Sequence, residues 1–338
     1  MKAAIIFILV VGALAAAYFL YPKFSGTSAE NKDKNPAAGG AAQTADTAKQ
    51  GENTQSGDAA KQYTGEAAAG QTQNPPAGGS APDVSALIAQ GDSLAASGKI
   101  LEACAAYSDA FRKILEQNAD FDGRAAMIDQ LKAKIKPLDD AIYFDRNRIF
   151  DDQETYVVQS GDNLTKIAAG HKVPYQFIGR VNGIPAPYTN LRAGQKLKIV
   201  NGPFNALIDL SDRRLYVFHG NYFFKDYEIS VGKPGWETPA GEYVVMDKMD
   251  STKSRLQWRD PEGSELHYSD VEKENFMLGT RWIRFDDNGH GIHGRSKQID
   301  GEPLGEAVSH GCVRMRNTDV EELYDLLVTN DSHVKVQK

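Results

Sequence analysis

The chain has 338 residues, of which 41% are hydrophobic, and its formal net charge is −7 at neutral pH. This length allows two or three domains of ordinary size. The acidic balance, with a pI near 5.6, argues against a general nucleic-acid binder, so we expect no nucleic-acid partner. The two cysteines, Cys104 and Cys312, lie in segments of different character, and we expect both to be reduced.

Residues 1–24 are predicted to be a membrane anchor or a signal segment. An uncharged apolar run extends from Ala3 to about Tyr21, close to the roughly 20 residues that a membrane-spanning helix needs. A cleaved signal peptide has a shorter apolar core of about 7–15 residues, whereas this run continues past the small residues Ala15–Ala17. We therefore favour an uncleaved anchor, which would hold the rest of the chain outside the cytoplasm, in the periplasm or cell wall.

Residues 25–82 are rich in Ala, Gly, Gln, Asn, Thr and Pro and contain almost no large apolar residue. Such a segment cannot bury enough surface to offset its chain entropy, so we expect a disordered linker. As a flexible coil of about 58 residues it would span roughly 40 Å. That reach suits a membrane-held protein that acts in a surrounding layer.

Residues 83–150 carry apolar residues at helical spacing, with Gly98 as a break between two helices. The stretch Gly91–Ala110 resembles one tetratricopeptide unit, although Leu115 stands where that family has a closing proline. Because one such unit is not stable alone, we predict a short helical hairpin with a third helix at about Arg124–Lys136. The hairpin is either a spacer or a docking surface for a protein partner.

Residues 154–201 are predicted to form a compact βααβ unit. A strand at Tyr156–Val158 precedes a helix with Asp162 as its N-cap, and a second helix begins at Pro174. Leu197–Val200 is the return strand.

This unit resembles a LysM domain. The resemblance is carried by Tyr156-Val157-Val158-Gln159-Ser160-Gly161-Asp162-Asn163-Leu164, by Asn182-Gly183 and by Leu191-Arg192-Ala193-Gly194-Gln195-Lys196-Leu197. It implies binding to a glycan that contains N-acetylglucosamine, such as the strands of peptidoglycan. The candidates for sugar contact that it implies are Gly161, Asp162, Asn163, Asn182, Gly183 and Ile184. The alternative is a small structural domain that has lost its ligand.

Residues 203–338 are rich in strand patterns. Strands are expected at Ala206–Leu210, Arg214–His219, Tyr222–Val231 and Glu242–Met246. The polar stretch Asp247–Phe276 is too long for an ordinary connection and is more typical of a functional excursion or lid. An amphipathic helix is expected at Thr318–Val328.

The run Ser309-His310-Gly311-Cys312-Val313-Arg314 places a thiol beside an imidazole, and Gly291-Ile292-His293-Gly294 supplies a second imidazole upstream. This pairing makes a nucleophile for acyl transfer, because the thiolate attacks and the imidazole manages the proton. Cys312 is therefore the candidate nucleophile. A neighbouring imidazole can make a thiolate–imidazolium ion pair far more populated than the free thiolate.

The two histidines have different expected roles. His293 comes from another segment and can approach the sulfur across a cleft, so we expect it to be the general base and acid. His310 either orients the loop or takes the proton itself. Gly311 lets backbone N–H groups face an incoming carbonyl oxygen, and one such donor contributes roughly 3 kcal/mol. Ser309 is expected to make a structural hydrogen bond.

These motifs resemble the L,D-transpeptidases of the YkuD type. The resemblance rests on His293 with Ser309-His310-Gly311-Cys312, and on Ile229-Ser230-Val231-Gly232-Lys233, Thr238-Pro239-Ala240-Gly241-Glu242-Tyr243 and Gly291-Ile292-His293-Gly294. It implies a mainly β catalytic domain with sandwich-like mixed sheets and a C-terminal helix. The oxyanion and substrate residues would be Gly311, Ser309, Arg314 and Gly294. Many members have Asn where this chain has Arg314, which would pair with a carboxylate either of the substrate or of the fold.

The resemblance also implies a reaction and its substrate. Cys312 would attack the third residue of a tetrapeptide stem of peptidoglycan, D-alanine would leave, and an amine or water would resolve the thioester. A stem amine gives a 3→3 crosslink, a protein lysine gives a tethered envelope protein, a D-amino acid gives exchange, and water gives carboxypeptidase action. The alternatives are an L,D-carboxypeptidase and a non-catalytic wall-binding scaffold.

No cofactor is expected. The side chains of His290, His293, His310 and Cys312 could in principle form a zinc site, but no second cysteine is near and the histidines lie in a Gly-rich segment. We therefore predict no metal, and we expect the partners to be peptidoglycan glycan strands, tetrapeptide stems and the membrane.

Overall fold

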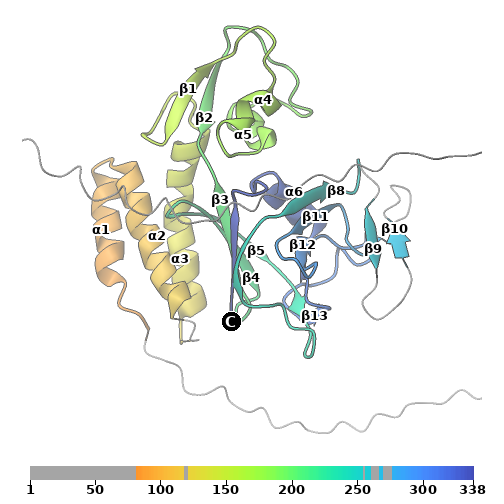
Figure 1. The fold of residues 1–338 in the computed structure, drawn as a ribbon. Coiled ribbons are helices and arrows are strands. Elements are labelled where there is room, and N and C mark those ends of the chain that lie inside the picture. Colours follow the sequence, from red (N-terminus) through yellow and green to blue (C-terminus); the bar gives the residue numbers. More distant parts are fainter. Residues whose placement is uncertain (1–80, 118–120, 254–255, 260–265, 269–275) are drawn as a thin grey trace, which may run out of the picture. The chain divides into compact units, whose positions relative to one another are not determined.

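A computed structural model describes residues 81–117, 121–253, 256–259, 266–268 and 276–338 (Figure 1). The predicted anchor, residues 1–24, and the predicted linker up to residue 80 lie outside these ranges. Within the ranges, no helix has the length and apolar character needed to cross a membrane. All described residues belong to one unit of the chain, Gln71–Lys338.

The predicted N-terminal helices are present. The helices α1 (Ser85–Ala96) and α2 (Ile100–Glu116) form a hairpin whose turn has Gly98 at a φ of +75°, a region in which glycine is unstrained (Figure 1). The third helix, α3 (Arg124–Asp139), is longer than predicted and continues through Pro137 into a short π-helix, η1 (Asp140–Phe144). The buried residues of these segments face the core on both sides of the proline, so packing outweighs the hydrogen bond that the proline removes.

The hairpin packs on a sheet formed by residues 203–338. Phe111 of α2 is fully buried between β4 (Arg214–His219) and β5 (Tyr222–Glu228). Its ring centroid lies 4.2 Å from that of Phe223 in a stacked arrangement and 5.6 Å from that of Tyr216. The apolar face of α2 is therefore covered by the chain's own sheet and does not remain open for a protein partner.

The LysM-like segment has the expected βααβ order. Its antiparallel strands β1 (Gln153–Val157) and β2 (Lys196–Val200) flank α4 (Leu164–Ala169) and α5 (Tyr175–Val181) (Figure 1). The prediction of Asp162 as the N-cap of α4 is wrong: Asn163 caps it by accepting from the Lys166 amide, at 2.9 Å. The Asp162 carboxylate instead closes the preceding turn, where it accepts from the Gln159 amide and the Tyr156 hydroxyl.

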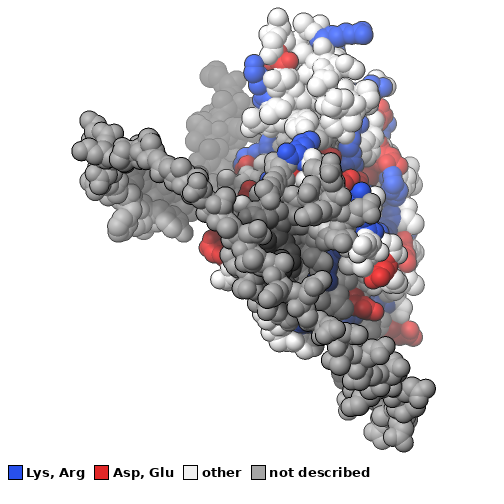
Figure 2. Space-filling model, turned by 90° about the vertical axis from the view of Figure 1, so that its right-hand side faces the viewer, with Lys and Arg blue, Asp and Glu red and all other residues white. Residues whose placement is uncertain are grey.

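Two polar contacts join this segment to its neighbours. The Lys198 ammonium of β2 is buried and donates to three carbonyls at the end of η1, those of Ile142, Asp145 and Arg148. Glu322 accepts from Arg180 of α5 at 3.0 Å and also pairs with Lys225 of β5. Basic and acidic side chains are interspersed over the coloured residues of the face in Figure 2, in keeping with such pairs.

Residues 203–338 form the β-rich domain that the sequence predicts. A five-stranded sheet has the order β5-β4-β3-β15-β7, and a four-stranded sheet has the order β14-β12-β11-β8. The new strand bounds are Phe204–Asp209 (β3), Gly241–Val244 (β7), Asp247–Asp250 (β8), Arg281–Arg284 (β11), Gly291–His293 (β12), Val313–Arg314 (β14) and His333–Gln337 (β15). Two smaller pairs are β6 (Val231–Gly232) with β13 (Ala307–Ser309) and β9 (Gln257–Arg259) with β10 (Leu266–Tyr268).

The structure adds detail to one expectation in this domain and corrects another. The stretch Asp247–Phe276 contains β8 as a regular strand of the four-stranded sheet as well as the short β9 and β10. The C-terminal helix, α6 (Asn317–Tyr324), ends four residues earlier than the predicted Val328. At this end of the helix, the Lys248 ammonium of β8 donates to the Tyr324 and Leu327 carbonyls, each at 2.5 Å. Burial lowers the pKa of Lys248 to about 7.

Candidate active site

The register of two strands brings the thiol and the upstream imidazole together. β12 and β14 are parallel, with Ile292 opposite Val313 and His293 opposite Arg314. Ile292 and Val313 are fully buried in the core. Because side chains alternate along a strand, His293, Arg314 and the preceding Cys312 share the opposite face.

His293 is held as a neutral base. It is 3% exposed, and its Nδ1 lies 2.7 Å from the Gly294 carbonyl oxygen. A carbonyl only accepts, so Nδ1 carries the hydrogen and Nε2 keeps its lone pair. Burial, and then the charge of Arg314, lower the pKa of His293 to about 3. The Trp282 ring lies beside the imidazole with 5.8 Å between the centroids.

Cys312 rests as a neutral thiol. Its side chain packs against an apolar cluster made of Leu256, Phe276, Leu278, Trp282 and Met249. Burial raises the pKa of Cys312 to about 11, although the Gly291 backbone N–H and the Arg314 charge act in the opposite direction. The ion pair that the sequence suggests is therefore not the resting state, because burial disfavours both charged forms.

The loop before Cys312 is fixed by two features. Ser309 is buried, and its hydroxyl donates to the Cys312 carbonyl, which is the structural hydrogen bond that we expected. Gly311 has a φ of +100°, where other residues are strained. A Cβ on Gly311 would also lie 2.7 Å from Cδ2 of His290. Both the backbone angle and the neighbouring ring thus require glycine.

His310 is placed away from the role of thiol base. Its Nε2 lies 2.9 Å from the Lys233 ammonium, which can only donate. Its ring meets the Trp236 ring edge-on, with 5.1 Å between centroids. Of the two expected roles, orientation of the loop fits this placement better.

Gly294 occupies a different place from the expected oxyanion and substrate role. Its N–H donates to the Arg281 carbonyl at 3.3 Å, and its own carbonyl accepts from His293. A Cβ here would lie 2.1 Å from Oδ1 of Asn317. Gly294 therefore positions the imidazole, and its N–H is already used within the sheet.

Arg314 stands opposite His293 and close to the thiol. Its pKa is lowered by burial and by the neighbouring Arg295, while Cys312 acts in the opposite sense. Among the residues that the structure describes, no carboxylate pairs with its guanidinium. We expected Arg314 to pair with a carboxylate either of the substrate or of the fold, and the described residues supply no such carboxylate.

Sequence reasoning missed two groups near the motif. The Asp286 carboxylate lies 2.6 Å from Nδ1 of His290, which the sequence suggested only as a potential zinc ligand. The spacing of four residues across a hairpin turn could have signalled this pair. Asn317 is the second, and its role depends on contacts with distant segments that no local pattern reveals. Within the described ranges, no three His, Cys, Asp or Glu side chains are grouped so as to hold a metal ion.

The candidate glycan residues separate into two groups. A groove of about 830 Å³ is lined by Asn182, Gly183 and Ile184, together with residues 189–195 and Arg146. Gly161, Asp162 and Asn163 do not line this groove. The amide of Asn182 is turned inward, where it donates to the carbonyls of Ile178 and Lys198 and accepts from the Lys198 N–H. Asn182 therefore shapes the groove through its backbone.

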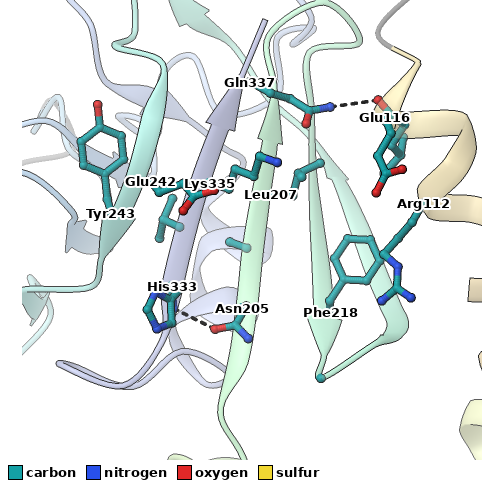
Figure 3. A pocket seen from close by; sticks show the side chains of 14 residues that line it. Arg112, Glu116, Asn205, Leu207, Phe218, Glu242, Tyr243, His333, Lys335 and Gln337 are labelled. Atoms are coloured by element: carbon teal, nitrogen blue, oxygen red, sulfur yellow. Dashed lines mark hydrogen bonds between the residues drawn. The ribbon is translucent and has the colours of Figure 1, made fainter. Parts of the chain in front are cut away.

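Another groove, of about 370 Å³, lies on the five-stranded sheet beside α2 (Figure 3). Its lining mixes charges, with Arg112 and Lys335 near Glu116 and Glu242. Neither the thiol nor the imidazole of the motif lines it, so it is separate from the candidate active site.

Comparison with known proteins now places both segments. The L,D-transpeptidase catalytic domain, YkuD, matches residues 203–336, and the LysM domain matches residues 156–200. The chain carries a YkuD L,D-transpeptidase catalytic domain with a LysM domain N-terminal to it. The YkuD resemblance inferred from the sequence motifs is thereby confirmed.

Proteins similar to this chain include two from Bacillus subtilis (strain 168) and one of solved structure. A Bacillus subtilis (strain 168) protein named as an L,D-transpeptidase, YkuD, is 28% identical over 191 residues, which cover 54% of this chain and 99% of that protein. A second protein of that strain, named as L,D-transpeptidase YqjB, is 31% identical over 121 residues, 31% of this chain and 60% of that protein. The solved L,D-transpeptidase from Mycobacterium smegmatis is 21% identical with a TM-score of 0.32, covering 43% of this chain and 64% of that chain.

The two domains together indicate a place of action. A LysM domain implies binding to peptidoglycan, and a YkuD domain acts on its peptide stems. This combination suggests a location in the cell envelope.

Proposed function

We propose that the chain is an L,D-transpeptidase that forms a thioester acyl-enzyme on Cys312 from tetrapeptide stems of peptidoglycan. One observation carries the proposal. The register of β12 and β14 puts the thiol and the imidazole of His293 on one face, and the Gly294 carbonyl fixes the tautomer that leaves Nε2 as the base.

The acylation follows from this geometry. His293 Nε2 takes the thiol proton as the sulfur attacks the carbonyl of the third stem residue. The imidazolium and the negative charge on the substrate therefore form during the attack and are not present in the resting site. Backbone N–H groups at Gly311 and Cys312 face the developing oxyanion. When the C–N bond breaks, the imidazolium gives its proton to the nitrogen of the departing D-alanine. The products are the thioester, free D-alanine and a neutral imidazole.

Arg314 binds a carboxylate of the stem in this proposal. It is partly buried beside the nucleophile and has no carboxylate partner among the described residues. A planar guanidinium binds carboxylates in bidentate fashion, and the stem carries carboxylates close to the scissile bond. Before the substrate binds, the same positive charge favours the thiolate over the thiol.

The remaining segments serve delivery to the wall. In the proposal, the groove of the LysM domain binds the glycan strand, while the segment 1–24 anchors the chain in the membrane. Binding to the glycan raises the local concentration of stems around Cys312 without any change in the catalytic site. The acceptor that completes the reaction is a stem amine, which makes a 3→3 crosslink, or a lysine of an envelope protein.

The test is incubation of purified protein with disaccharide-tetrapeptide, with the products read by mass spectrometry. We expect a crosslinked dimer and a Cys312 acyl adduct. Tripeptide without dimer would instead indicate an L,D-carboxypeptidase, and the absence of turnover would indicate a scaffold. Cys312→Ala removes the adduct, whereas the matched variant Cys104→Ala, at a buried free cysteine of α2, keeps it.

A further inference from the structure

A second imidazole stands beside the nucleophile loop. His290 lies at the start of β12, and its Nδ1 is 2.6 Å from Oδ2 of Asp286. The other carboxylate oxygen, Oδ1, accepts from the His290 backbone N–H at 2.7 Å. The Asp286 side chain is 7% exposed, whereas that of His290 is 25% exposed. A buried carboxylate thus orients an imidazole that solvent and ligands can reach.

The pairing fixes the tautomer of His290. An ionised carboxylate only accepts, so Nδ1 carries the hydrogen and Nε2 keeps the lone pair. A carboxylate on Nδ1 with Nε2 directed at the reacting groups is the arrangement that supports an imidazole base in acyl transfer. Nε2 of His290 faces Gly311, because a Cβ built on that glycine would lie 2.8 Å from it.

The thiol therefore shares a strand face with the imidazole of His293, while a second imidazole, that of His290, lies against the glycine that precedes Cys312. The Gly291 N–H reaches the Cys312 sulfur, and Gly291 stands between His290 and His293 on the chain. The surroundings of the two imidazoles differ. His293 is enclosed beside the Trp282 ring, whereas the side chain of His290 is 25% exposed and shares the surroundings of Gly311 with the backbone carbonyl of Trp236, a residue that is 39% exposed.

The two halves of the reaction make different demands on a base. Acylation needs a group that takes the thiol proton and then gives it to the leaving amine. The enclosed imidazole of His293 can do both. Deacylation begins with an ammonium ion, which must lose a proton before it can attack. That proton is best removed by a base at the open side of the thioester.

We propose that His290, oriented by Asp286, is the catalytic base that deprotonates the acceptor amine in the second half-reaction. The inference rests on the proposed function and assigns the acceptor to the Gly311 and Trp236 side of the thiol. His290 Nε2 takes one proton from the acceptor ammonium and later releases it to solvent. The amine nitrogen then bonds to the thioester carbonyl, the C–S bond breaks, and the second nitrogen proton passes through His293 to the sulfur.

The test compares two acceptors on the full protein. D-Methionine is an ammonium ion at neutral pH, whereas methoxyamine is already unprotonated and needs no base before attack. We expect His290→Gln to lower transfer to D-methionine by about 10²–10⁴-fold. Transfer to methoxyamine and the single-turnover release of D-alanine from disaccharide-tetrapeptide, measured with enzyme in excess, should both stay within about threefold. Asp286→Asn should act in the same direction, and His333→Gln, at an exposed histidine outside the site, should change none of the rates.

Three outcomes would overturn the inference. Equal losses in all three reactions at an unchanged melting temperature would mean that His290 only holds Gly311 in place. Unchanged transfer to both acceptors would mean that it has no role. A normal rate with D-methionine in Asp286→Asn together with a loss in His290→Gln would remove Asp286 from the proposal. A wild-type protein that releases no D-alanine would instead overturn the proposed function itself.

Discussion

At the scale of single residues, the resting site holds a neutral thiol and a neutral imidazole. Burial raises the pKa of Cys312 to about 11 and lowers that of His293 to about 3, since a poorly solvated site disfavours either charge. The positive charge of Arg314 lowers the pKa of Cys312, which favours the thiolate, and also lowers the pKa of His293, which disfavours the imidazolium. In the proposed reaction, the substrate carboxylate would offset the arginine charge beside the imidazole, and proton transfer would follow substrate binding.

The lowered pKa of His293 makes stability depend on pH. Between pH 6.5 and about 3 the unfolded state binds a proton that the folded state does not, so stability falls as the pH falls through this window. From pH 7 to pH 5 this histidine should cost the wild type about 2 kcal/mol of unfolding free energy. Urea unfolding at both pH values should show a loss that His293→Gln lacks and the exposed-site control His333→Gln keeps. Equal slopes in wild type and His293→Gln would contradict the prediction.

The charge of Arg314 should be visible in the reactivity of the thiol. Arg314→Gln removes a positive charge beside Cys312, so the pH at which alkylation by iodoacetamide reaches half its maximal rate should move upward. Alkylation of the Cys312 peptide is followed by mass spectrometry. The matched control is Arg316→Gln, since Arg316 pairs with Glu228 and is more exposed. An identical pH profile for Arg314→Gln and wild type would remove the arginine from this role.

At the scale of elements, Asn317 at the start of α6 ties together the segments that hold His293. Its Oδ1 accepts from the Thr280 N–H at 3.0 Å and from the Arg295 N–H at 3.3 Å, and its Nδ2 donates to the Arg295 carbonyl at 2.8 Å. The Gly294 carbonyl that orients His293 immediately precedes Arg295. One buried amide therefore fixes the end of β12 against the start of β11.

Removing this amide should affect both stability and turnover. Asn317→Ala leaves buried backbone groups of Thr280 and Arg295 without partners, which should cost about 1–3 kcal/mol of unfolding free energy. It should also lower kcat more than it raises KM, because Gly294 is held less firmly. Asn317→Asp keeps the acceptor oxygen and loses only the Nδ2 donor, so its loss should be smaller. Urea unfolding and steady-state kinetics check the order, and an unaffected Asn317→Ala would contradict it.

At the scale of the whole molecule, one hydrophobic core extends from the helical hairpin through the LysM domain into the catalytic sheet. Phe111 of α2 inserts among aromatic residues of β4 and β5, and Arg124 of α3 pairs with Asp212 of the catalytic domain. The hairpin is therefore part of the support of the catalytic sheet and more than a spacer between domains.

This shared core predicts cooperative unfolding of the described unit. Phe111→Ala should cost about 3–5 kcal/mol, because a large buried ring is replaced by a cavity. The loss should appear as one shifted transition in calorimetry, without a separate transition for the helices. Glu102→Ala, at an exposed position of the same helix, should change stability by less than about 0.5 kcal/mol. A separate early transition in Phe111→Ala would mean that the hairpin unfolds independently.

The sequence alone determined the parts with local signals. Apolar spacing and Gly98 defined the helical hairpin, alternation defined β3, β4 and β5, and the run around Cys312 led to the YkuD domain. Strand β15 was not predicted, because its pairing with β3 and β7 depends on segments far away in the chain. The end of α6 was also misjudged: the apolar pattern continues to Val328, whereas the helix ends at Tyr324.

Only the tertiary structure decided the states and neighbours of the candidate catalytic groups. The sequence contains a thiol and several histidines, but it does not reveal their protonation states. In the folded chain, burial favours the neutral forms of Cys312 and His293 over their ion pair. The register of β12 and β14 places His293 on the same face as Cys312. His310 instead contacts the ammonium of Lys233. The pair of Asp286 and His290 forms across a local turn, but its position beside Gly311 depends on how two distant segments meet. Dielectric surroundings and long-range register are properties of the folded chain, so no local pattern could supply them.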